Sequence, residues 1–250
     1  MAFLDGEKGR SVRRKLGICA YVGANGSGKS LAAVFDSVPS LLAGRPVLST
    51  VRLLDFENPR PCDDPNCEFP SHPDHLAAHP LWVPFTSWND LLQAEHCDVI
   101  MDEVTGVASS REASALPAPV ANFLVQLRRR DICLRWTSPA WARADRIIRE
   151  CTQGVALCYG YFGKRDKDTL WTRKSLFKIR LLDARDLDEL TESKKDRVRP
   201  IDVSFMSLKA CGAGNVYDTL DEVLSIPLIE GGRCLVCGGR KKIPYCSCCD

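Results

Sequence analysis

An eight-residue stretch near the N-terminus has the spacing of a phosphate-binding loop. Residues 23–30 read Gly-Ala-Asn-Gly-Ser-Gly-Lys-Ser and fit the Walker A pattern G-x-x-x-x-G-K-[ST]. The glycines let backbone N–H groups curl around phosphate oxygens, the lysine reaches the β- and γ-phosphates, and the serine hydroxyl can ligate Mg²⁺. We therefore expect ATP to be bound by Gly23, Ala24, Asn25, Gly26, Ser27, Gly28, Lys29, Ser30 and Leu31.

A pair of acidic residues follows a second apolar run. Residues 98–102 (DVIMD) predict a buried strand that ends at Asp102, and Glu103 comes next. This is the Walker B form, in which the Asp holds Mg²⁺ and the Glu orients the attacking water. A plain strand end gives the same letters, but together with Walker A they indicate ATP hydrolysis. We expect Lys29, Asp102 and Glu103 to be catalytic, and Ser30 with Asp102 to hold the magnesium ion.

Polar residues also end the next predicted strand, 132–137. Thr137 and Ser138 stand where related ATPases place a polar sensor near the γ-phosphate, although a turn before Pro139 needs the same residue types.

Arginines near this strand have two interpretations. Arg128, Arg129 and Arg130 end a predicted helix, where they could form a DNA-binding patch or an arginine finger for a neighbouring chain, or simply complement the helix dipole. Arg149, at the end of the following helix, is open to the same alternatives. Arg128 and Arg149 are the candidates for catalysis.

Clustered cysteines near the C-terminus predict a zinc knuckle over residues 229–250. The chain has 13 cysteines, and in a reducing compartment clusters of them indicate metal ligands before disulfides. Cys234-x₂-Cys237, then Cys246, Cys248 and Cys249, supply five thiols around a Gly-Gly turn. Tetrahedral zinc needs four ligands, so either Cys248 or Cys249 is spare. The alternative is a set of free thiols on a disordered tail.

A second zinc site is expected within an insertion at residues 55–80. This segment is rich in Pro, Asp, Cys and His and shows no helical or strand period, so a metal would have to supply its fold. The candidate ligands are Cys62, Cys67, His72 and His75, with His79 spare. Stray Cys and His in a polar loop remain the alternative. The other cysteines lie in apolar runs and are interpreted as small core residues: Cys19, Cys97, Cys133, Cys151, Cys158 and Cys211.

The elements that carry these motifs alternate between strand and helix. Strands are predicted at 16–22, 46–51, 82–85, 98–102 and 132–137, and helices at 29–42, 87–94, 117–130 and 142–150. Residues 154–162 and 170–182 predict a long hairpin at the sheet edge, and 183–199 a charged surface helix or loop. The fold class is therefore α/β, a P-loop NTPase with a mainly parallel central sheet. We divide the chain into an N-terminal tail (1–15), an ATPase domain (16–228) and the knuckle (229–250).

Composition narrows the class further. A length of 250 residues with 45% apolar and 26% charged residues is typical of a globular protein and excludes collagen-like or wholly disordered classes. With 34 basic and 32 acidic residues, nucleic-acid binding would have to come from local patches. The charged N-terminus lacks a signal peptide, and no run reaches the ~18 apolar residues of a membrane span. We expect a cytoplasmic protein with no membrane span of its own.

The order of the motifs resembles the zonula occludens toxin-like and filamentous-phage assembly ATPases, within the FtsK/HerA group. The resemblance covers roughly residues 16–220. It rests on the phosphate loop, VIMDE at 99–103, RRRD at 128–131, ICLRWTSP at 132–139 and DRIIRE at 145–150. Val216-Tyr217-Asp218-Thr219 is similar to a short tyrosine motif that follows the core domain in that group. Pro139 stands where the group often has a sensor Gln, and the membrane span common in the family is absent from this sequence.

The resemblance implies a motor ATPase of a mobile element, a phage, plasmid or integrative element, that acts in DNA transfer, packaging or assembly. It also implies self-association, with a hexameric ring as one arrangement, because translocating members bind ATP at subunit boundaries. The alternative is a non-translocating ATP-dependent switch or adaptor that presents its zinc modules to a protein or nucleic acid. A third class, a zinc-based nucleic-acid binder with a degenerate ATPase, is disfavoured because Lys29, Ser30, Asp102 and Glu103 are all intact.

Overall fold

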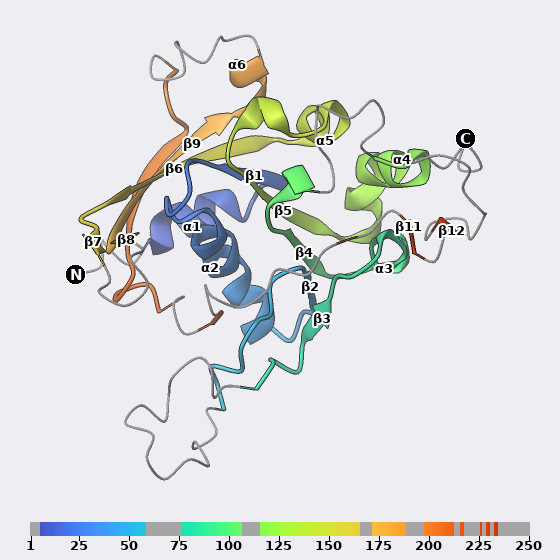
Figure 1. The fold of residues 1–250 in the computed structure, drawn as a ribbon, viewed down its shortest axis with the longest axis horizontal. Helices are drawn as coiled ribbons and strands as arrows, with labels where there is room; N and C mark the ends of the chain where they lie inside the picture. Colours follow the sequence, from blue (N-terminus) through green and yellow to red (C-terminus); the bar gives the residue numbers. More distant parts are fainter. Residues whose placement is uncertain are drawn as a thin grey trace.

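Strands and helices alternate along most of the chain in a computed structural model (Figure 1). It describes residues 6–58, 77–106, 116–165, 172–188, 198–212, 216–217, 226, 229–230 and 233–234. The helices are α1 (Glu7–Arg13), α2 (Lys29–Leu42), α3 (Trp88–Gln93), α4 (Ala118–Gln126), α5 (Arg146–Cys151) and α6 (Ala184–Asp188), with short 3-10 turns η3 (Val104–Gly106), η4 (Leu127–Arg130) and η5 (Trp141–Arg143). The strands are β1 (Ile18–Val22), β2 (Val47–Ser49), β3 (Trp82–Pro84), β4 (Asp98–Met101), β5 (Cys133–Ser138), β6 (Gly154–Tyr161), β7 (Lys164–Arg165), β8 (Thr172–Arg173), β9 (Leu176–Asp183), β10 (Asp202–Ser207), β11 (Ile229–Glu230) and β12 (Arg233–Cys234).

The central sheet has eight strands in the order β10-β9-β6-β1-β5-β4-β2-β3. The six strands from β6 to β3 pair in parallel, whereas β9 and β10 are added antiparallel at one end. The prediction of an α/β fold with a mainly parallel sheet is confirmed.

Helices cover both faces of the sheet, which explains why the central strand β1 (ICAYV) is apolar along its whole length. Every residue of β1 is buried. Cys19 and Tyr21 pack on the face covered by α2, and Ala20 packs on the opposite face among residues of α4 and α5. In Figure 1, α2 runs along the sheet beside β1, β5 and β4. This packing fixes the N-terminus of α2 at the end of β1.

The predicted edge hairpin is not at the edge. β6 and β9 pair over eight residues each, as expected of a hairpin, but β10 pairs with β9 and forms the edge itself. The strand was missed because DVSFMS follows a long charged stretch, and its alternating pattern is short. β7 and β8 form a separate two-stranded ribbon at the far end of the β6–β9 pair.

The N-terminal segment contains a helix that packs into the fold, where the sequence indicated a tail. Arg13 of α1 is 1% exposed and makes a two-pronged ion pair with Asp36 of α2, at 2.6 and 2.7 Å. The Tyr21 hydroxyl donates to Asp36 at 2.5 Å, and Arg13 also donates to Ser204 of β10 at 3.0 Å. A charged N-terminal segment predicts a solvent-exposed tail. Its burial can be recognised only in the structure, where Asp36 of α2 pairs with Arg13.

Two other predicted helices are shorter than expected. The helix expected over 117–130 is α-helical only to Gln126 and then tightens into η4, and the one expected over 142–150 is divided into η5 and α5. Asp145 caps α5 by accepting a hydrogen bond from the Ile147 N–H, which starts a new helix within the predicted one. No helix within the described ranges is both long and apolar enough for a membrane span.

The six cysteines interpreted from the sequence as small core residues are free thiols, and the core interpretation holds fully for three of them. Cys19, Cys97 and Cys158 are buried, and Cys133, Cys151 and Cys211 are partly buried.

Candidate functional site

The Walker A residues form a tight loop between β1 and α2. The loop leaves β1 at Gly23, whose N–H donates to the Ser138 carbonyl at 3.3 Å, and turns through a hydrogen bond from the Ser27 N–H to the Ala24 carbonyl at 3.1 Å. Gly26 and Gly28 have φ values of 70° and 88°, the left-handed region that side-chain-bearing residues avoid. The backbone N–H groups of the loop therefore lie at the N-terminus of α2, where N–H groups and the helix dipole favour binding of an anion.

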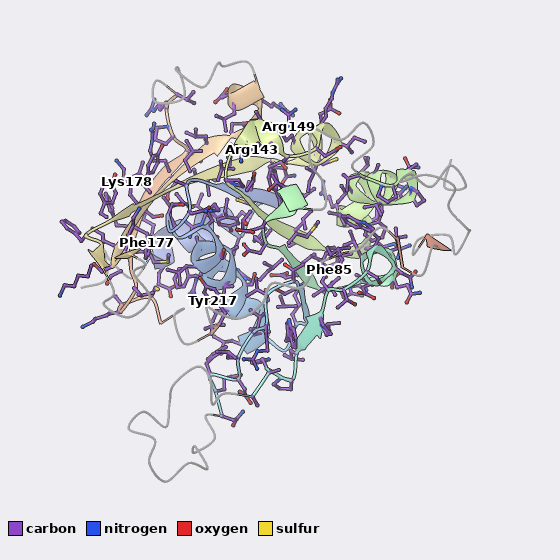
Figure 2. The ribbon with its side chains drawn as sticks, viewed as in Figure 1. Phe85, Arg143, Arg149, Phe177, Lys178 and Tyr217 are labelled. Carbon is purple, nitrogen blue, oxygen red and sulfur yellow. The ribbon has the colours of Figure 1, made fainter. Side chains whose placement is uncertain are left out.

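The β6–β9 pair forms a close wall against this loop. A Cβ on Gly28 would lie 2.5 Å from the ring of Phe177, and a Cβ on Gly160 would lie 2.9 Å from the Gly26 carbonyl oxygen. Figure 2 labels Phe177, which lies on the β9 side of α2. Glycine is thus required on both sides of the contact, because any side chain would push the loop away from the strand.

The Walker A lysine and serine point in different directions. Lys29 is 7% exposed, and its Nζ donates to the Ala24 carbonyl at 3.3 Å, so the ammonium lies over the loop. The Ser30 hydroxyl donates to Asp102 Oδ1 at 2.7 Å. The two motifs, 72 residues apart in the chain, are therefore in direct contact.

Asp102 and Glu103 are held by threonines from the two flanking strands. The Thr137 hydroxyl, at the end of β5, donates to Asp102 Oδ1 at 2.7 Å and accepts from the Glu103 N–H at 2.9 Å. On the other side the Asp102 N–H donates to Thr50 Oγ1 at 2.9 Å. Glu103 has a φ of 50° and an exposed side chain. Because a non-glycine residue in this conformation is strained, these hydrogen bonds hold Glu103 in place.

The structure separates the two polar residues that end β5. Thr137 belongs to the site, whereas the Ser138 hydroxyl donates to the Ala140 carbonyl at 2.7 Å and closes the turn after the strand.

Thr50 was missed by the sequence analysis. The signal available was the small polar pair Ser-Thr at the end of a predicted parallel strand, since the carboxyl ends of such strands meet at one edge. Tyr159, Tyr161 and Lys174, which lie beside the loop, were also missed. Their signal is weak, because aromatic residues in a hairpin are usual strand formers.

Arg128 lies at the opposite edge of the sheet from the Walker motifs. It is exposed in η4, which leads into Asp131 just before β5 begins. Asp131 accepts from Arg45 at 2.6 Å, and Arg45 also donates to Asp98 at the first residue of β4. These are the amino ends of the strands, whereas the loop and Asp102 are at the carboxyl ends. Arg128 cannot act in the site of its own chain.

Arg149 makes local contacts. Its Nε donates to the Ala144 carbonyl at 3.2 Å, and its guanidinium lies 5.8 Å from the ring centroid of Trp141. Arg143 (labelled in Figure 2) and Arg146, in the same β5–β6 connection, are both exposed, and neither was singled out from the sequence.

Most of the predicted zinc ligands lie outside the described residues. This holds for Cys62, Cys67, His72, His75, Cys237, Cys246, Cys248 and Cys249; of Cys234 only the backbone, in β12, is described. Within the described ranges, no three Cys, His, Asp or Glu side chains gather as a metal site. The spare His79 is described: it is 3% exposed and stacks on Phe56 with ring centroids 5.7 Å apart.

The residues present fit a nucleotide with its magnesium ion. The Ser27 hydroxyl is buried and has no hydrogen-bond partner in the described part of the chain, as expected of a donor whose partner is a ligand. Ser30 and Asp102 offer the oxygen ligands that Mg²⁺ prefers. Burial raises the pKa of the Cys158 thiol behind the loop to about 12, so it adds no negative charge near the phosphates at neutral pH.

Comparisons with known proteins found similar structures but no sequence relatives. No family model matches the chain, and no curated protein matches it in sequence. Among solved structures, the N-terminal domain of zonular occludens toxin from Neisseria meningitidis is 14% identical with a TM-score of 0.48, covering 80% of this chain and 98% of that one. The genome packaging NTPase B204 from Sulfolobus turreted icosahedral virus 2, in complex with ATP-gammaS, is 14% identical with a TM-score of 0.42, covering 68% and 93%. This chain is thus similar in structure to a zonular occludens toxin domain, the group that its motifs resemble.

Proposed function

We propose that the protein binds ATP with Mg²⁺ at the Walker A loop and hydrolyses it to drive a motor of a mobile genetic element. The observation that carries this proposal is the cluster of Ser30, Asp102, Thr137 and Glu103, which joins the ends of α2, β4 and β5 by hydrogen bonds of 2.7 to 2.9 Å. An arrangement that only bound phosphate would not need a strained, exposed glutamate fixed beside the aspartate.

Each side chain has a separate task in this proposal. Lys29 and the loop N–H groups bind and orient the phosphates, and Ser30 with Asp102 holds the cation. Glu103 is aimed by Thr137 so that its carboxylate orients and takes a proton from the attacking water. When bound, the magnesium nucleotide supplies the phosphoanhydride bond and the positive charge that offsets the phosphates.

DNA is the polymer that we propose the motor acts on. The structurally similar B204 from Sulfolobus turreted icosahedral virus 2 is described as a genome packaging NTPase. In this chain, the outer face of β9 and β10 carries Lys178 opposite Phe205 and Arg180 opposite Val203 (Lys178 is labelled in Figure 2). All four side chains are at least partly exposed. A basic sheet face that carries an aromatic side chain suits a phosphate backbone and a stacked base.

The test is ATP turnover with and without single- and double-stranded DNA. We expect DNA to raise the rate, and Lys178→Glu to reduce that stimulation while the rate without DNA is unchanged. A rate that DNA does not change would favour the alternative, a switch that does not translocate.

Self-association is the second part of the proposal. The Walker A loop contains no arginine that could offset the negative charge of the transition state. An arginine from a neighbouring chain would therefore complete the site. We would mix Arg149→Ala or Arg128→Ala chains, each with an intact loop, with Lys29→Ala chains that keep the arginines. Recovery of turnover in the mixture supports completion between chains. A rate that is independent of protein concentration and unchanged by both arginine substitutions contradicts it.

We also propose that the ATPase domain of residues 16–228, against which helix α1 packs, is followed by a zinc knuckle over 229–250, and that a second zinc ion lies in the 55–80 insertion. The spacing of the Cys and His residues in the sequence supports this part.

A further inference from the structure

We propose that a pocket beside the Walker A loop holds the base and ribose of the nucleotide, with Tyr159 and Tyr161 as its aromatic wall. The inference rests on the proposed ATP binding and adds a specificity-determining surface to it. The pocket has a volume of about 340 Å³, within the range of small-molecule sites. The lining residues include Val22, Ser27, Leu157, Tyr159, Tyr161 and Lys174.

The position of the pocket follows from the strand order. β1, which carries the loop, lies between β5 on one side and β6 on the other, and β4 lies beyond β5. Asp102 follows β4 and bonds Ser30, so the magnesium and the terminal phosphates belong on the β5 side of the loop. The other end of a triphosphate laid across the loop therefore faces β6, where the pocket opens.

The side chains of the pocket suit a nucleoside. Val22 and Leu157 provide apolar surface, and two tyrosines on alternate positions of β6 provide flat rings against which a planar base can stack. Tyr161 is 43% exposed, a high fraction for an aromatic ring at the mouth of a pocket, so a ligand would bury more of it.

Polar groups in the pocket face the same space. The Ser27 hydroxyl lines it, is 4% exposed and has no partner within the described residues. Lys174 lines it from the β8–β9 connection, and its side chain lies against Gly160. A buried hydroxyl and a cation next to apolar walls match the junction of phosphate, ribose and base. The close approach of Gly160 to Gly26 joins this pocket to the loop.

The test compares ATP with inorganic tripolyphosphate, which carries the phosphates without the nucleoside. Dissociation constants are measured by calorimetry with Mg²⁺ present. We expect the wild type to bind ATP more tightly than tripolyphosphate. Tyr161→Ala should reduce that preference about tenfold, equivalent to about 1.4 kcal/mol, while the affinity for tripolyphosphate is unchanged. Tyr161→Phe keeps the ring and should keep the preference.

Phe162→Ala is the matched control, because Phe162 is the next residue, is 74% exposed and does not line the pocket. It should leave both constants unchanged. If Tyr161→Ala alters both ligands equally or neither, the nucleoside does not contact this wall and the inference is wrong.

A second measurement uses the unaltered protein. Photolabelling with 8-azido-ATP should attach to the peptide that contains Tyr159 and Tyr161, and labelling confined to another segment would overturn the inference. Failure of the proposed function gives a different result, since the wild type would then bind neither ATP nor tripolyphosphate.

Discussion

Replacing Thr137 by valine tests how the Walker B residues are positioned. Valine has nearly the shape of threonine, and Thr137 is fully buried, so the change removes a hydroxyl and leaves the packing. Two hydrogen bonds are lost: the one donated to Asp102 Oδ1 at 2.7 Å and the one accepted from the Glu103 N–H at 2.9 Å. Glu103 is then free to leave its left-handed conformation, which has a φ of 50°.

The size of the effect follows from these two bonds. A hydrogen bond to a charged group contributes about 1.5–3 kcal/mol, and a buried N–H left without a partner costs about 1–3 kcal/mol. If about 3 kcal/mol of this acts on the transition state, the turnover number falls roughly 10²-fold. The affinity for ATP should change far less, because the hydrogen bonds of Thr137 go to Asp102 and Glu103, whereas Lys29 bonds the Ala24 carbonyl within the loop.

The assay is steady-state ATP turnover together with ATP binding by calorimetry. Thr137→Ser is the matched control, since it keeps the hydroxyl and should retain most of the turnover. The reasoning is refuted if Thr137→Val turns over ATP at the wild-type rate, or if serine and valine reduce the rate equally.

Three further predictions concern stability and metal content. Asp36→Ala should lower the free energy of unfolding by about 3–5 kcal/mol in urea titrations, because it leaves Arg13 charged and buried without its partner, and adding Arg13→Met should recover part of the loss. Burial raises the pKa of the Cys158 thiol to about 12 in the folded protein, whereas the unfolded thiol ionises near pH 9.0. The free energy of unfolding should therefore fall by up to about 1.4 kcal/mol per pH unit above about pH 9. In Cys158→Ala this fall should be less steep. Elemental analysis should find up to two zinc ions per chain, one of them lost on replacing Cys234 and Cys237 by serine; folded protein without zinc would contradict both predicted sites.

The loop and the helix after it could be predicted because both depend on local sequence. α2 begins at Lys29 and ends at Leu42 as expected, since the glycine-rich turn fixes its start and Gly44 with Pro46 fixes its end. Ser30 and Asp102 were expected to lie together because the Walker A and Walker B motifs assign both of them to one magnesium ion, and they are hydrogen-bonded to each other.

Contacts between distant segments could not be predicted in the same way. The burial of Arg13 depends on Asp36 and on Ser204 of β10, 191 residues away from Arg13. The sequence around Tyr159 and Tyr161 predicts a strand. It does not predict that this strand lies beside the Walker A loop, because that position results from the pairing of β6 with β1. The location of Arg128 at the opposite edge from the site likewise required the register of β4 and β5.

In the proposed mechanism, Glu103 activates the water that hydrolyses ATP. We would measure ATP binding and ATP turnover for the wild type, Glu103→Gln and Lys29→Ala under the same conditions. We expect Glu103→Gln to bind ATP as tightly as the wild type but to turn it over at least about 10²-fold more slowly, and Lys29→Ala to lose binding. Wild-type turnover by Glu103→Gln would contradict the proposed mechanism.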